Sequence, residues 1–173
     1  MKMRKYLLLS ISAAAIALAT AVPLSAGAAT PASFTLTAGA LGISAPTNSV
    51  SLGTEVASSD QTTLSGALGV VTVTDERGGT TTWTTSVIST AFTPTAGPAD
   101  PASNLSYSAG VITSDPNVTA TATDSSDLTG VTPVVSGAST GVSTASWNPT
   151  ITIVVPADYA PGVYTATITH SVA

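Results

Sequence analysis

The sequence contains a single histidine, His170, so any catalysis that uses an imidazole depends on this residue. A hydrolase of the Ser-His-Asp type requires a serine and a carboxylate that converge on such a ring. His170 is in phase with Ile168 and Val172, in a segment where apolar and hydroxyl side chains alternate. This phase favours a packed or hydrogen-bonded histidine at the end of a strand over a catalytic one.

The densest group of charges is Asp75, Glu76 and Arg77. Two carboxylates can hold a hard cation such as Ca²⁺, or the three charges can contact a partner. The alternative is a tight hairpin turn in which Arg77 pairs with a neighbouring carboxylate. The segment lacks the D-x-D-x-D-G spacing of calcium loops, so the sequence favours the turn and predicts no metal site. Asp75 and Arg77 remain candidate binding residues.

A second pair of carboxylates is Asp124 and Asp127. A glycoside hydrolase needs two carboxylates that face each other across a cleft. Nothing in the sequence brings any two of the nine acidic residues together in that way. We therefore predict that the protein is not an enzyme and uses no cofactor.

The two tryptophans, Trp83 and Trp147, are candidates for a platform on which a sugar stacks. Tryptophans of β-sandwiches usually lie in the core, because a large ring contributes much apolar burial. Trp147 directly precedes Asn148-Pro149 at a strand boundary, and for it both interpretations stay open.

The elements that must position these residues are strands. No segment after residue 28 keeps the 3.6-residue apolar spacing of a helix, whereas runs rich in Val, Ile and Thr are typical of strands. Turn residues separate the runs, and Thr93–Ser103, with three prolines, is expected to form a long surface loop. We predict strands at Ser33–Thr37, Ser49–Leu52, Leu64–Asp75, Thr81–Phe92, Leu105–Thr113, Val118–Thr123, Val131–Val135, Ser143–Trp147, Thr150–Val155 and Gly162–Val172.

The clearest alternation lies at the C-terminal end. One face of the last predicted strand carries Tyr164, Ala166, Ile168, His170 and Val172, and one face of the preceding strand carries Ile151, Ile153 and Val155. A Pro/Gly turn joins the two strands and predicts a hairpin with one buried side. Short alternating strands of this regularity predict an all-β fold, an antiparallel β-sandwich of Ig-like or Greek-key type.

The N-terminal residues predict export. Three basic residues within the first five positions precede an apolar run from Tyr6 to Leu18, and Ala26-Gly27-Ala28 provides the small residues of a cleavage site. This arrangement is typical of a secretory signal peptide. The apolar run is shorter than the roughly 20 residues that span a bilayer. We expect a signal peptide at 1–28, a single domain at 29–173 and a secreted mature form without a membrane span.

Charge excludes one class of partner. Residues 29–173 hold a single basic residue, Arg77, against nine acidic residues. Nucleic acids and anionic membranes bind through Lys and Arg, so neither is an expected partner.

The chain also has no cysteine, so its stability must come from an ordinary core and not from disulfides.

Two segments resemble conserved blocks of WxL-domain proteins, which are secreted surface proteins of Gram-positive bacteria. The first runs from Leu64 through Val73-Thr-Asp-Glu-Arg-Gly78 to Trp83 and Phe92. The second is the tail from Val155-Pro through Gly162-Val-Tyr-Thr-Ala-Thr-Ile168 to His170. Both depart from the family pattern, since Trp83-Thr-Thr lacks the leucine and His170-Ser-Val replaces the second Trp-x-Leu. The resemblance implies a β-sandwich at the cell envelope. The place of Trp83 in the first block also favours the core for this residue over a sugar platform.

These observations lead to three functional hypotheses. The first is a secreted, non-catalytic surface protein that associates non-covalently with the Gram-positive cell wall, through peptidoglycan or another surface protein. The second is a structural subunit that self-assembles by edge-strand pairing, because strands without lysine leave edges unprotected. The third is an extracellular carbohydrate-binding module. The candidate binding residues are Trp83, Trp147, Asp75, Arg77 and His170.

Overall fold

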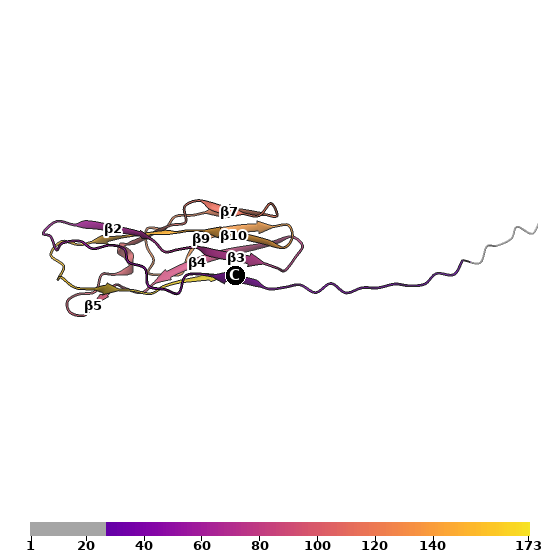
Figure 1. Cartoon of the computed structure of the whole chain (residues 1–173), viewed down its shortest axis with the longest axis horizontal. Coiled ribbons are helices and arrows are strands. Elements are labelled where there is room, and N and C mark those ends of the chain that lie inside the picture. Colours follow the sequence, from indigo (N-terminus) through magenta and orange to yellow (C-terminus); the bar gives the residue numbers. More distant parts are fainter. Residues whose placement is uncertain (1–26) are drawn as a thin grey trace, which may run out of the picture. The chain divides into compact units, whose positions relative to one another are not determined.

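The computed structural model describes residues 27–173, and all of its strands lie within one compact unit, Leu36–Ala173. Two layers of antiparallel strands enclose an apolar core, and residues 27–173 contain no α-helix (Figure 1). The predicted all-β sandwich is therefore confirmed. In this part of the chain no helix is long and apolar enough to cross a membrane. The predicted signal peptide lies outside the described residues, apart from its last two positions.

Besides one short strand near the start of the described chain, the first layer is built from three long stretches, each broken into two strands. At one end its order is β1 (Leu41–Ser44), β3 (Val71–Asp75), β10 (Ser143–Trp147) and β7 (Ile112–Ser114). At the other end the order is β2 (Thr62–Ala67), β11 (Thr150–Val155) and β6 (Leu105–Ser108). Glycines with positive φ, Gly69 at 96° and Gly110 at 67°, lie at two of the breaks.

The second layer has the order β13 (Ile168–Val172), β4 (Thr81–Ser89), β9 (Thr132–Ser139) and β8 (Val118–Ala122). The short pair β12 (Tyr164–Thr165) and β5 (Thr93–Pro94) continues this layer beyond β13 and β4. At that end the second layer is two strands wide, whereas the first layer has three. A single turn of 3₁₀ helix, η1 (Ala102–Asn104), lies between β5 and β6.

The core follows from the strand period of two. In β3, β4 and β10, buried residues alternate with more exposed residues, most of which are threonine or serine. The buried members come from both layers and include Val71, Val73, Trp83, Val87, Leu105, Tyr107, Leu128, Val134, Val135, Ala145, Trp147, Ile151 and Ile153. Full burial of one large apolar side chain contributes roughly 1.5–3 kcal/mol, so these rows hold the two layers together.

The strand predictions succeed where alternation and turn residues agree. β10 and β11 have the predicted bounds, whereas no strand forms at Ser33–Thr37 or Ser49–Leu52, and β1 was missed. Phe34 and Leu36 alternate with hydroxyl residues as in a strand, but both side chains are exposed and no backbone pairs with their segment in the described residues. Alternation alone does not make a strand, because a strand also needs a free edge beside it.

Several predicted strands are interrupted or extended. The stretches Leu64–Asp75, Leu105–Thr113 and Gly162–Val172 each contain two strands, and β9 continues four residues beyond the predicted Val135. The predicted loop Thr93–Ser103 includes β5 and part of η1. The breaks allow each stretch to change direction between the two ends of its layer.

Two predicted hairpins are wrong. β11 pairs with β2 and β6, whereas β12 and β13 pair with β5 and β4 in the other layer. The turn after Asp75 likewise leads from β3 in the first layer to β4 in the second. The alternation of the C-terminal strand is confirmed, since residues 164, 166, 168, 170 and 172 are all less exposed than their neighbours. Alternation indicates which side is buried, but it is the same whether a turn returns to a neighbouring strand or crosses to the opposite layer.

Candidate functional site

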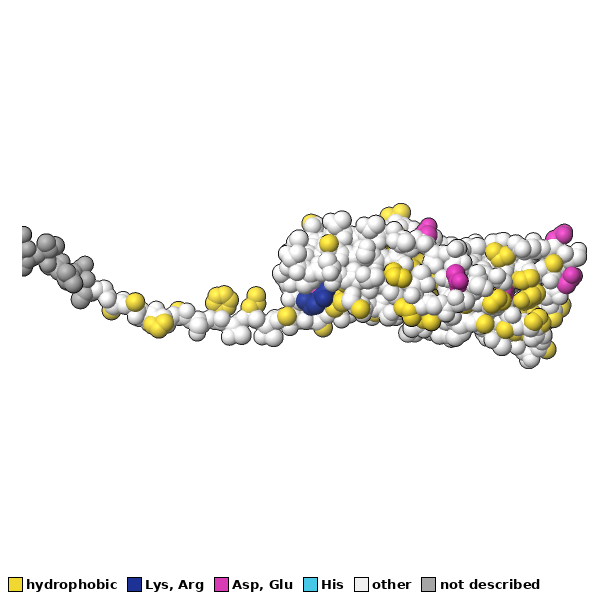
Figure 2. Space-filling model, turned by 180° about the vertical axis from the view of Figure 1, so that it is seen from behind, with side chains coloured by type: hydrophobic (Ala, Val, Ile, Leu, Met, Phe, Trp, Pro, Cys, Tyr) yellow, Lys and Arg dark blue, Asp and Glu magenta, His cyan; other side chains and the backbone are white. Residues whose placement is uncertain are grey.

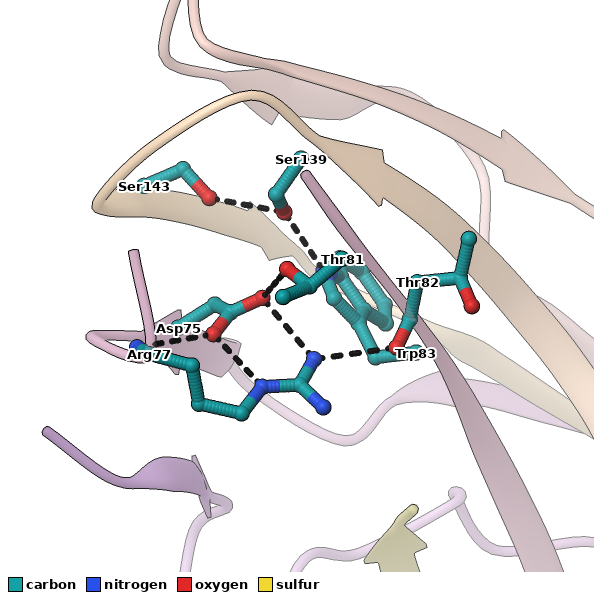
Figure 3. A network of polar contacts seen from close by, with 7 residues as sticks. All are labelled: Asp75, Arg77, Thr81, Thr82, Trp83, Ser139 and Ser143. Carbon is teal, nitrogen blue, oxygen red and sulfur yellow. Dashed lines mark hydrogen bonds and ion pairs between the residues drawn. The ribbon is translucent and has the colours of Figure 1, made fainter. Parts of the chain in front are cut away.

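The turn between β3 and β4 forms a closed polar network around Asp75 (Figure 3). The guanidinium of Arg77 donates from Nε to Oδ1 of Asp75 at 2.8 Å and from an Nη atom to Oδ2 at 2.9 Å. The hydroxyl of Thr81 donates to Oδ2 at 2.7 Å, and the backbone N–H of Arg77 donates to Oδ1 at 3.2 Å. The same Nη atom of Arg77 also donates to the carbonyl of Thr82 at 2.9 Å.

This network leaves Asp75 little capacity for a ligand. Its side chain is 1% exposed, and its pKa lies well below the ordinary value. The side-chain hydrogen bonds from Arg77 are the main cause, while burial acts in the opposite direction. Residues 27–173 contain no group of three side chains suited to a metal ion. The structure therefore supports the predicted structural turn, with the correction that it joins two layers.

The tryptophans belong to the core and not to a surface. Trp83 is 3% exposed and Trp147 is 2% exposed. The indole Nε1 of Trp83 donates to Oγ of Ser139 at 3.3 Å, and its ring covers Gly137 on the neighbouring strand. Neither ring can stack against a sugar while it is buried, which corrects the alternative of a tryptophan platform.

One pattern that sequence reasoning missed is Gly137-Ala138-Ser139-Thr140-Gly141, which matches G-x-S-x-G. A nucleophile elbow needs a strand-to-helix turn that exposes the serine. Here the serine ends β9, and the chain turns into β10. Ser139 is fully buried, and its Oγ accepts hydrogen bonds from Trp83 and from Oγ of Ser143 at 3.0 Å (Figure 3). In this chain the serine of the pattern is a buried structural residue and not an exposed nucleophile.

His170 belongs to a second polar chain that joins the layers. Its Nε2 lies 3.2 Å from the hydroxyl of Tyr107 on β6, and that hydroxyl accepts a hydrogen bond from Nε1 of Trp147 at 2.8 Å. Burial lowers the pKa of His170, and burial raises the pKa of Tyr107 to about 12. At pH 7 both the phenol and the imidazole are therefore mainly neutral, and the phenol O–H is free to donate to Nε2. Tyr107 was not singled out from the sequence, although it is in phase with Leu105.

Asp100, Asp124 and Asp127 do not share a cleft. Asp100 is 1% exposed, accepts a hydrogen bond from Nδ2 of Asn104 at 2.6 Å, and has its pKa raised by burial. Oδ1 of Asp127 accepts the backbone N–H of Thr129 at 2.8 Å, which lowers the pKa of Asp127. Asp124 lines a separate shallow hollow of about 320 Å³ among serine and threonine side chains.

A groove of about 760 Å³ with exposed apolar walls lies at the end of the sandwich that carries β2, β5, β11 and β12. We call it the end groove. Its walls come from the segment Ser49–Ser58, from β2 and β11, and from Tyr159–Thr165. Three valines on these walls are exposed: Val56 (81%), Val163 (75%) and Val50 (40%). Figure 2 shows hydrophobic side chains gathered toward this end of the body.

Two outer strands flank the end groove. At this end β2 is an outer strand of the first layer, and β12 is one of the two strands of the second layer. Thr62 and Leu64 of β2 and both residues of β12 line the groove. Each strand pairs on one side only within the described residues. The groove therefore combines apolar walls with unpaired strand edges, which is the arrangement that accepts an extended polypeptide.

The structure places the five sequence candidates away from the end groove. Asp75, Arg77 and Trp83 form the network at the β3–β4 turn, and Trp147 joins His170 through Tyr107. None of the five lines the groove. Of the predicted strands, Ser49–Leu52 supplies part of the groove wall, where Leu52 packs against Gly66 of β2.

Comparisons of the chain with protein-family models, with curated proteins and with solved structures gave no match. The resemblance to WxL-domain proteins therefore stays a prediction from the two motif blocks.

Proposed function

We propose that this chain is a secreted, non-catalytic protein of the Gram-positive cell surface that binds a wall-bound protein partner through its end groove. The observation that carries the proposal is the groove itself. Its volume of about 760 Å³ is within the range of ligand sites, and its walls are mainly apolar. The signal peptide and the WxL-like blocks predicted from the sequence support the location.

The chemistry of the groove favours a polypeptide over the glycan of peptidoglycan. Exposed valines and the Tyr159–Tyr164 pair, with ring centroids 6.0 Å apart, provide apolar contact area. The hydroxyls of these tyrosines donate to carbonyls of the chain itself, that of Tyr159 to Ala99 and that of Tyr164 to Ala160. A hydroxyl-rich glycan needs many polar partners, whereas an extended apolar segment needs apolar walls and strand edges.

A sedimentation assay tests this proposal. Purified protein is incubated with washed Gram-positive cell walls, with protease-treated walls and with isolated peptidoglycan, at low and moderate salt. We expect the protein to pellet with washed walls and to remain in the supernatant with the other two. Val56→Asp is expected to abolish pelleting, because it places a charge on an apolar wall of the groove.

The matched control is Val111→Asp, since Val111 is 87% exposed and lies outside the groove. This variant is expected to pellet like the native protein. Complete recovery of the native protein in the supernatant contradicts surface association. Equal pelleting of both aspartate variants contradicts the assignment of binding to the groove.

A further inference from the structure

We propose that the end groove of one molecule is occupied by the segment Ser33–Thr37 of a second copy of this chain, so that molecules associate head to tail. This inference rests on the proposed function of the groove as a site for an extended apolar segment, and it names the partner. The first observation concerns the segment. Phe34 is 92% exposed and Leu36 is 89% exposed, and no strand includes them.

The composition of the segment matches what the groove accepts. Phe34 and Leu36 alternate with Ser33, Thr35 and Thr37, so an extended backbone places both large apolar side chains on one side. Hydroxyl side chains then face the opposite side. A strand that adds to an edge uses its backbone for affinity and alternate side chains for pockets. The segment has this pattern without a partner strand in the described residues.

Charge also fits. Glu55 and Asp60 lie on the wall of the end groove, and the chain carries nine acidic residues in total. A segment that carries Asp or Glu would therefore meet like charge at this wall. The stretch from Ala28 to Thr54 contains no charged side chain, so Ser33–Thr37 can enter the groove without like-charge repulsion.

The length of the chain decides that the occupant belongs to another molecule. The backbone N–H of Gly39 donates to the carbonyl of Glu76 at 2.9 Å, which anchors this point beside the end of β3. Leu36 precedes Gly39 by three residues and stays within about 11 Å of this anchor. Leu64 on the groove wall lies at the far end of the β2–β3 stretch, and the 11 residues to Asp75 span roughly 35 Å. A molecule's own Leu36 cannot cover this distance.

Head-to-tail contacts of this kind leave one free segment and one free groove on every complex, so they propagate into open chains. Two variants test the segment and the groove separately. The donor-deficient variant carries Phe34→Ser and Leu36→Ser, and the groove-deficient variant carries Val56→Asp and Val163→Asp. All four residues are at least 75% exposed, so the fold should tolerate these changes.

The experiment is sedimentation velocity of the exported form, beginning at Ala29, over a wide range of concentration. The native protein is expected to form a growing series of oligomers, and each variant alone is expected to remain monomeric. An equimolar mixture of the two variants is expected to give dimers and nothing larger, because only one intact segment and one intact groove are present. Each single serine substitution should weaken association about tenfold or more, as expected for the loss of one large buried apolar side chain.

Three results overturn the inference: a native protein that is monomeric at all concentrations, variants that assemble alone as edge pairing predicts, or a mixture that forms no dimer. A labelled peptide of residues 30–40 gives a second readout, since it should bind the donor-deficient variant in fluorescence polarisation, whereas a scrambled peptide should not. A monomeric protein that still pellets with walls in a Val56-dependent manner refutes self-association and leaves the proposed function intact.

Discussion

At the scale of single residues, the polar side chains with the strongest chemical promise are used to join the two layers. Asp75 is satisfied by Arg77 and Thr81, and His170 reaches Trp147 through Tyr107. The inward direction of His170 could be predicted from strand alternation. Its partner could not, because a period of two indicates a face and not the residue on the opposite layer.

Gly137 tests the packing of Trp83. The two residues are directly opposed on β9 and β4, and a Cβ on Gly137 would overlap the indole ring. Gly137→Ala is expected to lower the free energy of unfolding by about 2–3 kcal/mol, since overpacking a core forces its neighbours to shift. Chemical denaturation measures this change. Gly42→Ala is the matched control, because a Cβ there meets no atom within 4 Å, and it should leave stability unchanged or slightly higher. Equal effects of both substitutions would contradict this packing.

A substitution at Thr85 is expected to raise the free energy of unfolding. It is fully buried in β4, and its hydroxyl has no hydrogen-bond partner among the described residues. An unsatisfied buried hydroxyl costs about 1–3 kcal/mol, and valine has a similar shape. Thr85→Val should therefore raise the free energy of unfolding by about 1 kcal/mol and raise the melting temperature. A lower melting temperature would show that the hydroxyl is satisfied in solution.

His170 predicts a dependence of stability on pH. Burial lowers the folded pKa below the ordinary value of 6.5, so below pH 6.5 the unfolded state binds more protons than the folded state. Stability is then complete above pH 6.5 and falls as the pH decreases towards the folded pKa. His170→Phe should remove this loss, and melting temperature against pH for both proteins measures the difference. Parallel curves between pH 7 and 5 would place His170 in solvent.

At the scale of elements, the sequence predicted which stretches are strands better than it predicted how they connect. β10 and β11 have their predicted bounds, whereas the turns after Asp75 and Val155 cross between layers. Turn residues indicate where a strand stops, but the layer that the chain enters next depends on contacts between segments distant in sequence. The two outer strands that flank the end groove could not be identified for the same reason.

The crossing after β3 depends on the ion pair. Removing Arg77 leaves the carboxylate of Asp75, which is 1% exposed, with only Thr81 and a backbone N–H. Arg77→Met should lower the free energy of unfolding, because the carboxylate of Asp75 loses the partner that makes most of its side-chain hydrogen bonds. Asp75→Asn combined with Arg77→Met should recover part of this loss. Glu76→Gln, on an exposed neighbour, is the control and should change stability little. A loss as small as that of Glu76→Gln would show that the ion pair does not hold the turn.

At the scale of the whole molecule, the residues with reactive or charged side chains that the sequence singled out lie apart from the end groove. The residues chosen from the sequence lie in the core or in the β3–β4 turn, and none of them lines the accessible apolar walls of the end groove. Val50 and Leu52 were predicted to belong to a strand, and they line the groove instead. Apolar residues in a short run can pack in a core or border a ligand site, and only the fold distinguishes these outcomes.

Hydrogen exchange of the protein bound to washed cell walls tests the central claim most directly. Residues 49–58 form no strand and are almost all exposed, so their amides should exchange rapidly in the free protein. We predict that wall binding slows exchange in 49–58 and 159–165, and leaves the β3–β4 turn unchanged. Unchanged exchange in both groove segments, together with slower exchange on another face of the bound protein, would contradict the account.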